Sequence, residues 1–281
     1  MQIIFVCTGN TCRSPMAEGY LNSLKLAGIT AESRGLFADG SAVSKNSAEV
    51  MGELGFDITD HISRQFTAED LSADMIICLS PTHRETLIAA GVSSEKLQVL
   101  GGGIADPFGG DIHIYRLCRD EIIEAIDELV FSGALLPYRT GSAEYSHIPY
   151  IAELEKECFS DPWSVNVIEE SFAAGTKFFT ATDLDGTVLG YIGISAVLDE
   201  GYITNIAVSG NHRGKGIGTL LLNKVFAFAR QKGLSFVSLE VRASNDAAIT
   251  LYTKLGFARE GERRDFYNNP RENAIIMTKR F

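Results

Sequence analysis

The chain has 281 residues, a formal net charge of −11 and 45% hydrophobic residues. Two globular domains are expected, because this length exceeds that of a usual single domain. The charge is uneven: residues 1–132 carry 19 acidic and 9 basic side chains, whereas residues 133–281 carry 17 and 16. Neither part has the positive excess of a general nucleic-acid binder, so a nucleic-acid partner is not expected.

The cysteines and the apolar runs indicate in which cellular compartment the protein resides. Five cysteines are an odd number in a long chain, which does not make a disulfide framework and suits a reducing interior. No apolar run approaches 18 residues, and the N-terminus begins directly with a strand-like segment. These features predict a cytoplasmic protein with no membrane partner. The five histidines lack the spacing of metal ligands, so no metal site is expected.

In the first half, strand-like and helix-like segments alternate. Apolar runs typical of buried parallel strands lie at residues 2–7, 75–79 and 97–100. Helices are expected after Ser14, near Ser47, after Ser80-Pro81 and from Asp111. The pattern predicts an α/β fold, with a doubly wound parallel sheet over residues 1–132.

After a Ser-Gly-Ala break at residues 132–134, the pattern changes. Strands are predicted at 177–182, 188–196, 202–208 and 236–241, with more strands near the C-terminus. Residues 183–187 read Asp-Leu-Asp-Gly-Thr, a hairpin signal between the first two of these strands. Helices are predicted at 215–232 and 245–255, and the Asp161-Pro162 pair indicates another helix start. Residues 134–281 therefore form a second expected α/β domain.

The segment Cys-Thr-Gly-Asn-Thr-Cys-Arg-Ser at residues 7–14 directly follows the first strand. Its backbone amides and the following helix N-terminus can surround an anion, and Arg13 can clamp two of the anion's oxygens. A thiolate in such a positive field is a nucleophile toward phosphorus, which assigns that role to Cys7.

This segment resembles the Cys-x5-Arg-Ser signature of the low-molecular-weight protein phosphatases, and Asp106-Pro107 resembles their second motif. The resemblance implies that Cys7 attacks phosphorus, that Arg13 stabilises the oxyanions and that Asp106 protonates the leaving group. Ser14 would donate to the thiolate and Asn10 would hold the loop's shape. The implied substrate-binding residues are Thr8, Gly9, Asn10, Thr11, Cys12, Ser14 and Phe108.

Two departures bear on the substrate. Family members that act on phosphotyrosine usually carry a bulky aliphatic residue where this chain has Thr11. They also often carry two aromatic residues after Asp-Pro, whereas here Phe108 is followed by Gly109. Both departures resemble the bacterial protein-arginine phosphatase branch, since a threonine hydroxyl can bond a guanidinium. Phosphoarginine in a protein is the favoured substrate, with phosphotyrosine as the rival.

Other interpretations of this half remain open. Arsenate reductases share the loop, but they need closely spaced resolving cysteines, and Cys78 and Cys118 stand 40 residues apart. The loop could also be a phosphate-binding turn, or part of a phosphoprotein-binding module tethered to the second half. Cys12 is either a loop filler or a partner that forms a disulfide with oxidised Cys7.

A second constellation begins at Arg213-Gly214-Lys215-Gly216-Ile217-Gly218, between a strand and a long helix. Such glycines let a pyrophosphate approach the helix N-terminus. The loop is followed by Leu-Glu-Val-Arg-Ala-Ser-Asn at 239–245 and by Ala-Ile-x-Leu-Tyr at 248–252. Together these resemble the GNAT acetyltransferases, and Asp-Pro-Trp-Ser at 161–164 with Asn-Ile-Ala-Val at 205–208 narrows the resemblance to ribosomal-protein-alanine N-acetyltransferases of the RimI type.

This resemblance implies an acetyl-CoA-dependent transferase that acetylates the N-terminal alanine of a protein, a ribosomal protein in this family. Glu240 would act as base through water, Tyr252 would protonate the departing thiolate, and Trp163 would line the acceptor side. Each of these three residues could instead have a purely structural role, which for Trp163 would be packing in the core. A small amine is the alternative acceptor. The cofactor-binding residues implied are Ile206, Ala207, Val208, Arg213, Gly214, Lys215, Gly216, Ile217, Gly218 and Asn245. The two activities are expected to run independently.

Overall fold

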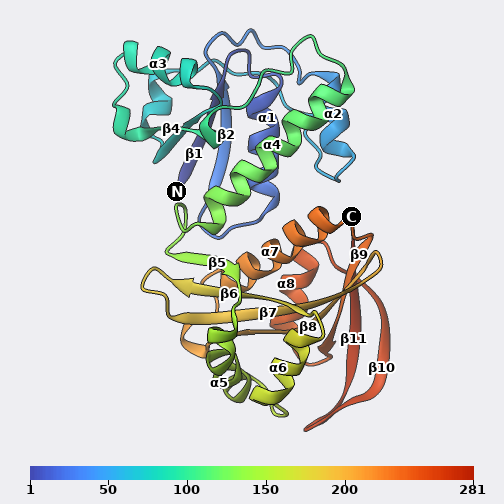
Figure 1. Ribbon diagram of the computed structural model, residues 1–281. Coiled ribbons are helices and arrows are strands. Elements are labelled where there is room, and N and C mark those ends of the chain that lie inside the picture. Colours follow the sequence, from blue (N-terminus) through green and yellow to red (C-terminus); the bar gives the residue numbers. More distant parts are fainter. The chain divides into compact units, whose positions relative to one another are not determined.

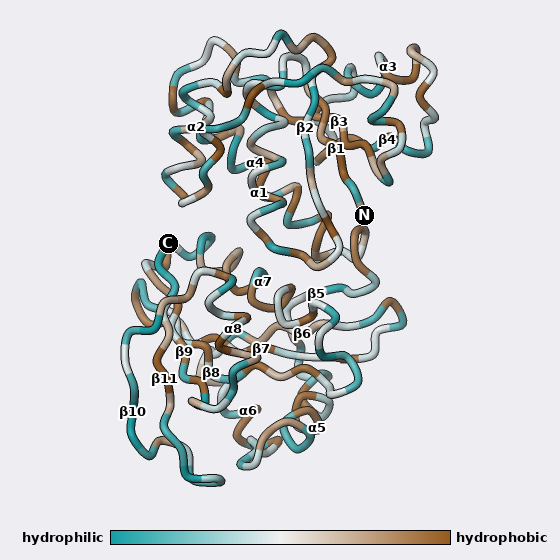
Figure 2. The backbone as a smooth tube through the Cα atoms, turned by 180° about the vertical axis from the view of Figure 1, so that it is seen from behind, coloured by the Kyte–Doolittle hydropathy of each residue, from teal (hydrophilic) through white to brown (hydrophobic).

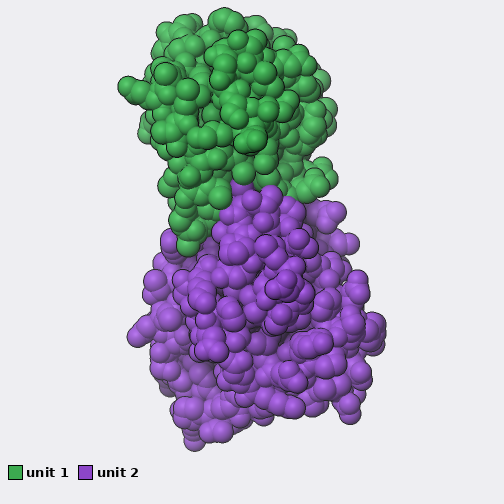
Figure 3. All heavy atoms as spheres, turned by 90° about the vertical axis from the view of Figure 1, so that its left-hand side faces the viewer, with its two compact units in different colours: residues 1–129 green, residues 130–281 purple.

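The computed structural model describes all 281 residues, and they form two compact units, residues 1–129 and 130–281 (Figure 3). Both units combine helices with one β-sheet (Figure 1). The fold is therefore α/β in each unit. None of the helices combines the length and the apolar character that crossing a membrane would require.

The sheet of the first unit is parallel and has the order β2-β1-β3-β4. Its strands are β1 (Gln2–Cys7), β2 (Thr30–Gly35), β3 (Met75–Cys78) and β4 (Leu97–Val99). Strands β1 and β3 are hydrophobic along most of their length (Figure 2), as a sheet buried on both faces requires. Strand β2 was not predicted from the sequence. It reads Thr-Ala-Glu-Ser-Arg-Gly and lies at the edge of the sheet, where polar residues are tolerated, so it has no hydrophobic run.

The four main helices of this unit lie where the sequence predicts them. They are α1 (Arg13–Ser23), α2 (Lys45–Gly52), α3 (Pro81–Ala89) and α4 (Ile112–Phe131). Helices α2 and α3 begin at serine caps, since the side chains of Ser44 and Ser80 accept hydrogen bonds from backbone N–H groups in the first turn. The expected helices are thus confirmed, and the starts of α2 and α3 are set by these caps.

The loop after β1 lies where the strand order of this sheet reverses direction. From β1 the chain runs to β2 on one side, while β3 and β4 lie on the other side. Loops that leave the carboxyl ends of the strands at such a reversal diverge and leave room for a ligand. Cys7 ends β1 at this point, and Pro81 begins α3 shortly after β3.

The second unit has a seven-stranded sheet with the order β10-β11-β9-β8-β7-β6-β5. Its strands are β5 (Tyr138–Ser142), β6 (Lys177–Asp183), β7 (Val188–Val197), β8 (Glu200–Val208), β9 (Phe236–Arg242), β10 (Ala258–Asn268) and β11 (Arg271–Arg280). All neighbours are antiparallel except β8 and β9. The short edge strand β5 was not expected, whereas the hairpin between β6 and β7 is confirmed. At the opposite edge, β10 is mainly hydrophilic (Figure 2), which suits an exposed edge strand.

Helices cover both faces of this sheet (Figure 1). Helices α5 (Ile148–Cys158) and α6 (Val165–Ala173) belong to one apolar cluster, and α7 (Ile217–Lys232) and α8 (Asp246–Lys254) to the other. The start of α6 differs from the expectation at Asp161-Pro162. The helix begins at Val165 because the Ser164 side chain accepts the N–H of Val167 and caps it.

The parallel pair β8 and β9 separates soon after it forms. The pairing covers only Glu200–Tyr202 of β8 against Phe236–Ser238 of β9. On the other side of β8, the register with β7 shifts at Thr204, whose buried hydroxyl oxygen has no hydrogen-bond partner. Such irregularities bend a strand and end its pairing. From Ile203 onward, β8 therefore has an unpaired edge on the side of β9.

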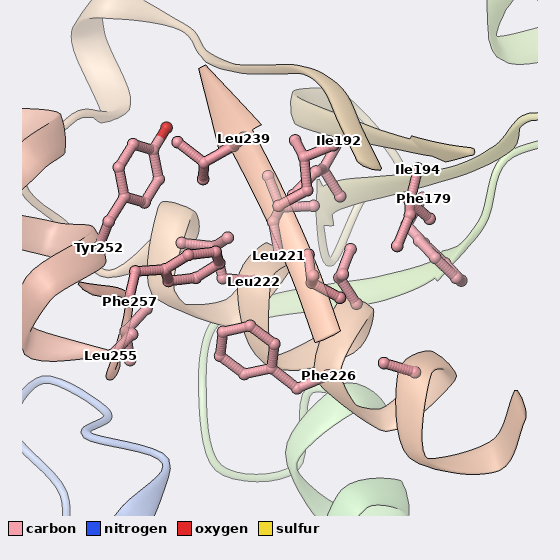
Figure 4. Close-up of a cluster of buried hydrophobic side chains, with 14 of the residues drawn as sticks. Phe179, Ile192, Ile194, Leu221, Leu222, Phe226, Leu239, Tyr252, Leu255 and Phe257 are labelled. Carbon is pink, nitrogen blue, oxygen red and sulfur yellow. The ribbon is translucent and has the colours of Figure 1, made fainter. Parts of the chain in front are cut away.

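The larger core of the second unit provides a test of its stability. Leu221 on α7 is fully buried within the cluster drawn in Figure 4. Leu221→Ala should lower the free energy of unfolding by about 2–5 kcal/mol, because it removes buried methyl groups and leaves a cavity. Urea unfolding followed by the fluorescence of Trp163, the only tryptophan, would measure this. The control is Leu198→Ala at a side chain that is 94% exposed. An equal loss in the control would contradict the assignment of Leu221 to the core.

Candidate active sites

The first site is a loop that curls around the Cys7 sulfur. The carbonyls of Cys7, Thr8 and Thr11 accept hydrogen bonds from the backbone N–H groups of Leu36, Phe37 and Ser44, at 2.8–2.9 Å. Because a peptide's N–H points opposite to its C=O, carbonyls turned outward leave the loop's amides turned inward. Amides arranged in this way can bind an anion.

The Cys7 thiol has two hydrogen-bond partners within this loop. The backbone N–H of Asn10 donates to Sγ at 3.3 Å, and the Ser14 hydroxyl lies 3.0 Å from Sγ. Both groups can donate hydrogen bonds to the sulfur.

Asn10 holds the turn of the loop. Its φ of 55° is left-handed, a conformation that asparagine tolerates better than most residues. Its side-chain amide donates to the hydroxyls of Ser14 and Ser33 at 2.9 and 2.8 Å, and its side-chain oxygen accepts the N–H of Arg64 at 2.8 Å. Asn10 is fully buried, so these bonds satisfy a side chain that has no contact with water.

Arg13 and Asp106 meet at this loop although 93 residues separate them. The Arg13 guanidinium is buried and donates to the Ile104 carbonyl at 3.1 Å and to Asp106 Oδ2 at 2.5 Å. The Asp106 side chain is 47% exposed and therefore faces the mouth of the site. The structure thus brings Cys7, Arg13 and Asp106 together, as expected from the two motifs.

Sequence reasoning missed His83 as a member of this site. His83 lies in the first turn of α3, and its Nε2 atom is 2.9 Å from the Thr8 hydroxyl. Burial, and next the charge of Arg13, lower the pKa of His83 to about 4, so the ring is neutral near pH 7. The Ser80-Pro81 helix start after β3 was the available signal, because it places this turn at the carboxyl edge of the sheet.

The remaining predicted residues line the mouth or support the loop. Phe108 is 80% exposed beside Asp106, and Phe37, which the sequence reasoning did not single out, is also exposed. Cys12 is buried, with its sulfur 3.5 Å from the Tyr115 hydroxyl. Burial raises the pKa of both Cys78 and Cys118 to about 12, which leaves these thiols poor nucleophiles.

The second site begins where β8 leads toward α7. Gly214 and Gly216 have φ values of 74° and 87°, which only glycine adopts without strain. Gly216 caps α7 without a side-chain hydrogen bond, so the first amides of this 16-residue helix remain available. The Arg213 guanidinium turns back instead, donating to the Val208 carbonyl at 3.1 Å. Free amides at the start of a helix can bind an anion.

Beside this loop lies the unpaired edge of β8, which carries the predicted residues Ile206, Ala207 and Val208. An extended chain with amide groups, such as the pantetheine arm of a coenzyme A thioester, can pair with a strand edge of this kind. Its pyrophosphate would then reach the N-terminus of α7. The geometry therefore fits acetyl-CoA, although Asn245 serves in the structure as the cap of α8, accepting the N–H of Ala248.

Glu240 lies on β9, one of the two separated strands, and Tyr252 lies on α8. Glu240 on β9 is 31% exposed and its carboxylate lies 3.4 Å from the Arg263 guanidinium. Tyr252 on α8 is buried, and Figure 4 shows its hydroxyl pointing away from the apolar side chains, beside Leu239 near the carboxyl end of β9. Burial raises the pKa of Tyr252, so the phenol holds its proton at neutral pH.

Trp163 belongs to the segment between α5 and α6. Its side chain packs against the cluster formed by these helices, and its backbone N–H donates to Glu155 at 2.7 Å. Glu155 is fully buried, and the Tyr191 hydroxyl and the Asn205 amide also donate to it. Three donors thus satisfy a buried carboxylate and join this segment to β7 and β8.

Comparisons with known proteins match each unit to a separate family. The model of the low molecular weight phosphotyrosine protein phosphatases matches residues 2–136, and that of the acetyltransferase (GNAT) family matches residues 148–257. A protein-arginine-phosphatase of Geobacillus stearothermophilus is 38% identical over 46% of this chain and 93% of that protein. A low molecular weight protein-tyrosine-phosphatase, PtpB of Staphylococcus haemolyticus, is also 38% identical, over 46% of this chain and 97% of that protein.

The second half resembles a Bacillus subtilis protein provisionally named ribosomal protein bS18-alanine N-acetyltransferase. The two are 33% identical over 46% of this chain and 87% of that protein. The chain therefore belongs to the low molecular weight phosphatase family through its first half and to the GNAT acetyltransferases through its second. One polypeptide thus contains two enzymes, a protein phosphatase and an N-acetyltransferase.

The shape of the phosphatase loop depends on Gly35 at the end of β2. A Cβ atom there would lie 2.8 Å from the Thr8 carbonyl oxygen and 3.0 Å from the Asn10 nitrogen, both backbone atoms. Gly35→Ala should therefore shift the loop and lower phosphatase kcat/KM by roughly 10- to 100-fold, with acetyl transfer unchanged. The matched control is Gly52→Ala, where the added Cβ meets nothing within 4 Å. Full phosphatase activity in Gly35→Ala would show that the loop tolerates the displacement.

Proposed function

We propose that the first unit hydrolyses phosphoarginine in proteins through a phosphocysteine intermediate. Cys7 Sγ attacks phosphorus, and the bond between phosphorus and the guanidine nitrogen breaks as Asp106 donates a proton to that nitrogen. Water then attacks the phosphocysteine and gives its proton to Asp106, which releases phosphate and restores the thiolate. The observation that supports this most strongly is the assembly of Cys7, Arg13 and Asp106 around one cradle of amides.

Arg13 and Ser14 support both steps. Arg13 is buried, and its two bonds hold it next to the loop, where a phosphoryl group would offer its guanidinium a bidentate partner. Binding of the phosphoryl group would draw Arg13 from Asp106 and leave that carboxyl free for proton transfer. The Ser14 hydroxyl would stabilise the thiolate as attacking group and again as leaving group.

The choice of phosphoarginine rests on the mouth of the site. Thr11 is half-buried in the loop, and its hydroxyl oxygen can accept a hydrogen bond from a guanidinium N–H. After Asp106-Pro107, Phe108 is followed by Gly109 with a φ of 80°, so a second aromatic side chain is missing there. The remaining loop residues Thr8, Gly9 and Cys12 would contact the phosphoryl group through their backbone.

The substrate proposal predicts the effect of Thr11→Ile. The parent chain should hydrolyse a phosphoarginine peptide faster than the matched phosphotyrosine peptide, and Thr11→Ile should lower the ratio of the two kcat/KM values by about 10-fold, the value of one lost polar contact to a charged group. Phosphate release from the two peptides measures this. Cys7→Ser, as a control, should abolish both hydrolyses and leave acetyl transfer intact. A parent preference for phosphotyrosine would instead assign a tyrosine phosphatase.

For the second unit we propose acetylation of the N-terminal amine of a protein, with alanine as the first residue and a ribosomal protein as the acceptor. Acetyl-CoA supplies the activated acetyl group. Its pantetheine arm would pair with Ile206–Val208, and its pyrophosphate would bind the loop 213–218, with Asn245 contacting it nearby. The separation of β8 from β9 next to the start of α7 is the observation that supports this proposal most strongly.

Glu240 and Tyr252 divide the proton transfers. Glu240 is partly exposed and can take a proton from the acceptor amine through water. Tyr252 keeps its proton at neutral pH and can donate it to the departing thiolate. We place the domains at residues 1–132 and 134–281, each with a complete set of groups for its own reaction.

The proposal predicts that Tyr252→Phe lowers kcat for acetyl transfer by roughly 100-fold, the usual contribution of general acid catalysis, with acetyl-CoA affinity retained. Thiol release with an alanine-initiated peptide measures turnover, and calorimetry measures acetyl-CoA binding. Unchanged turnover would remove Tyr252 from the mechanism. Polyamines tested in parallel separate the acceptor classes, because faster transfer to them would indicate a small-amine acetyltransferase.

A further inference from the structure

The Thr8 hydroxyl and the His83 ring meet where two neighbouring strands leave the sheet of the first unit. In the parallel pair of β1 and β3, Val6 pairs with Cys78, so the segments that follow these strands leave the sheet side by side. Thr8 lies two residues beyond Val6, and α3 begins at Pro81, three residues beyond Cys78. This register brings His83 Nε2 to 2.9 Å from Thr8 Oγ1, across 75 residues of sequence.

The start of α3 holds the His83 ring in place. Ser80 Oγ accepts the backbone N–H of His83 at 3.3 Å, and Pro81 occupies the first position of the helix. The His83 side chain is buried, whereas Thr8 is exposed. A fixed, buried ring thus supports a hydroxyl group that a substrate can reach.

His83 is neutral at pH 7 because of its surroundings. Burial is the largest cause that lowers the pKa of His83 to about 4, the Arg13 charge acts in the same direction, and Asp106 opposes both. A neutral imidazole carries one N–H group, so one ring nitrogen is a donor and the other is an acceptor. The hydrogen bond between His83 and Thr8 can therefore run in either direction, depending on which nitrogen carries the proton.

The second ring nitrogen decides between these two directions. Nδ1 of His83 is buried and has no hydrogen-bond partner. A proton on Nδ1 would make it a buried N–H donor without an acceptor, which folded proteins avoid more strictly than an unpaired acceptor. The proton is therefore assigned to Nε2, which then donates to Thr8 Oγ1.

This direction of the bond leaves the proton of the Thr8 hydroxyl available to a ligand. The proton points away from the ring, because the Thr8 oxygen is already the acceptor on that side. A phosphoryl group attacked by Cys7 offers oxygen acceptors, whereas a guanidinium offers only N–H donors. An O–H group that donates to a charged oxygen forms one of the stronger hydrogen bonds in proteins. The available donor therefore matches the phosphoryl group rather than the arginine part of the substrate.

We propose that His83 is a positioning residue for the phosphatase reaction: its Nε2–H group orients the Thr8 hydroxyl, which donates a hydrogen bond to the phosphoryl group in addition to the loop amides. This bond is the same for phosphoarginine and phosphotyrosine, because both carry the phosphoryl group. The inference rests on the proposed attack by Cys7, but not on which phosphorylated residue is hydrolysed.

The test uses the full chain with Thr8→Val, His83→Leu, His83→Gln and the double variant Thr8→Val/His83→Leu. Glutamine keeps an N–H donor that can replace Nε2, whereas leucine has none. The control is Thr86→Val, because Thr86 lies on the same helix and its hydroxyl bonds locally to the Thr82 carbonyl at 2.9 Å. Three quantities are measured: kcat/KM for a phosphoarginine peptide, kcat/KM for the matched phosphotyrosine peptide, and the Kd of inorganic phosphate by calorimetry.

We expect Thr8→Val and His83→Leu each to lower kcat/KM for both peptides by about 10-fold and to raise the Kd of phosphate similarly, the effect of one hydrogen bond to a charged group. The ratio of the two kcat/KM values should stay within about 2-fold of the parent, in contrast to Thr11→Ile. His83→Gln should retain most of the parent activity. His83→Leu should add little in the Thr8→Val background, since both changes remove the same bond. Thr86→Val should match the parent.

Unchanged kcat/KM and phosphate affinity in Thr8→Val would overturn the proposal. A changed ratio of the two kcat/KM values would also overturn it, because the Thr8 hydroxyl would then contact the residue that carries the phosphoryl group. Additive losses in the double variant would show that His83 does not act through Thr8. If the parent binds phosphate but hydrolyses neither peptide, the proposed function fails, while the phosphate affinities of the variants still decide the role of His83. A parent that does neither would contradict both.

Discussion

Both sites depend on backbone amides that the sheets do not use. Wherever a parallel pair of strands ends or separates, the N–H groups beyond the last ladder bond need other partners. In the first unit this happens after Cys7, where the carbonyls bond outward and the amides of the loop turn toward the sulfur. In the second unit it happens after Tyr202, where β8 leaves β9 and the glycine loop opens α7. Phosphorylated and pyrophosphate-bearing ligands suit such places, because they supply the missing acceptors.

Buried polar groups hold each site in shape. Asn10 and Glu155 are each fully buried, and each is surrounded by partners that satisfy it. A buried polar group left unpaired costs more than its hydrogen bond contributes when paired, so these groups strongly favour one arrangement of the segments around them. Asn10 fixes the curl of the phosphatase loop, and Glu155 fixes the Trp163 segment. Rigid support of this kind keeps reacting groups within the small displacements that catalysis tolerates.

The two enzymes have separate chemical requirements. The proposed phosphatase reaction needs a cysteine sulfur, a cradle of backbone amides with an arginine, and a carboxyl group, and the first unit brings Cys7, Arg13 and Asp106 together. The proposed acetyl transfer needs a strand edge, a helix N-terminus and a protonated phenol, and the second unit contains all three. The proposed substrates, a phosphoprotein and a protein N-terminus, are both macromolecules, which fits the exposed Phe37 and Phe108 beside the phosphatase loop.

The amino-acid sequence was enough to identify the two families and the principal strands and helices, and it predicts the reactive residues, because all of these depend on local signals. Hydrophobic runs mark buried strands such as β1, serine and proline mark helix starts such as α3, and the motifs around Cys7 and Glu240 occupy short continuous segments. Tertiary structure alone decided which distant residues meet. Thr8 meets His83 across 75 residues, Arg242 joins Ser160 to Asn269, and the polar edge strands β2 and β5 form only because a sheet offers them a partner. Contacts at such separations arise from packing and long-range pairing, which leave no periodic or short-range signal in the chain.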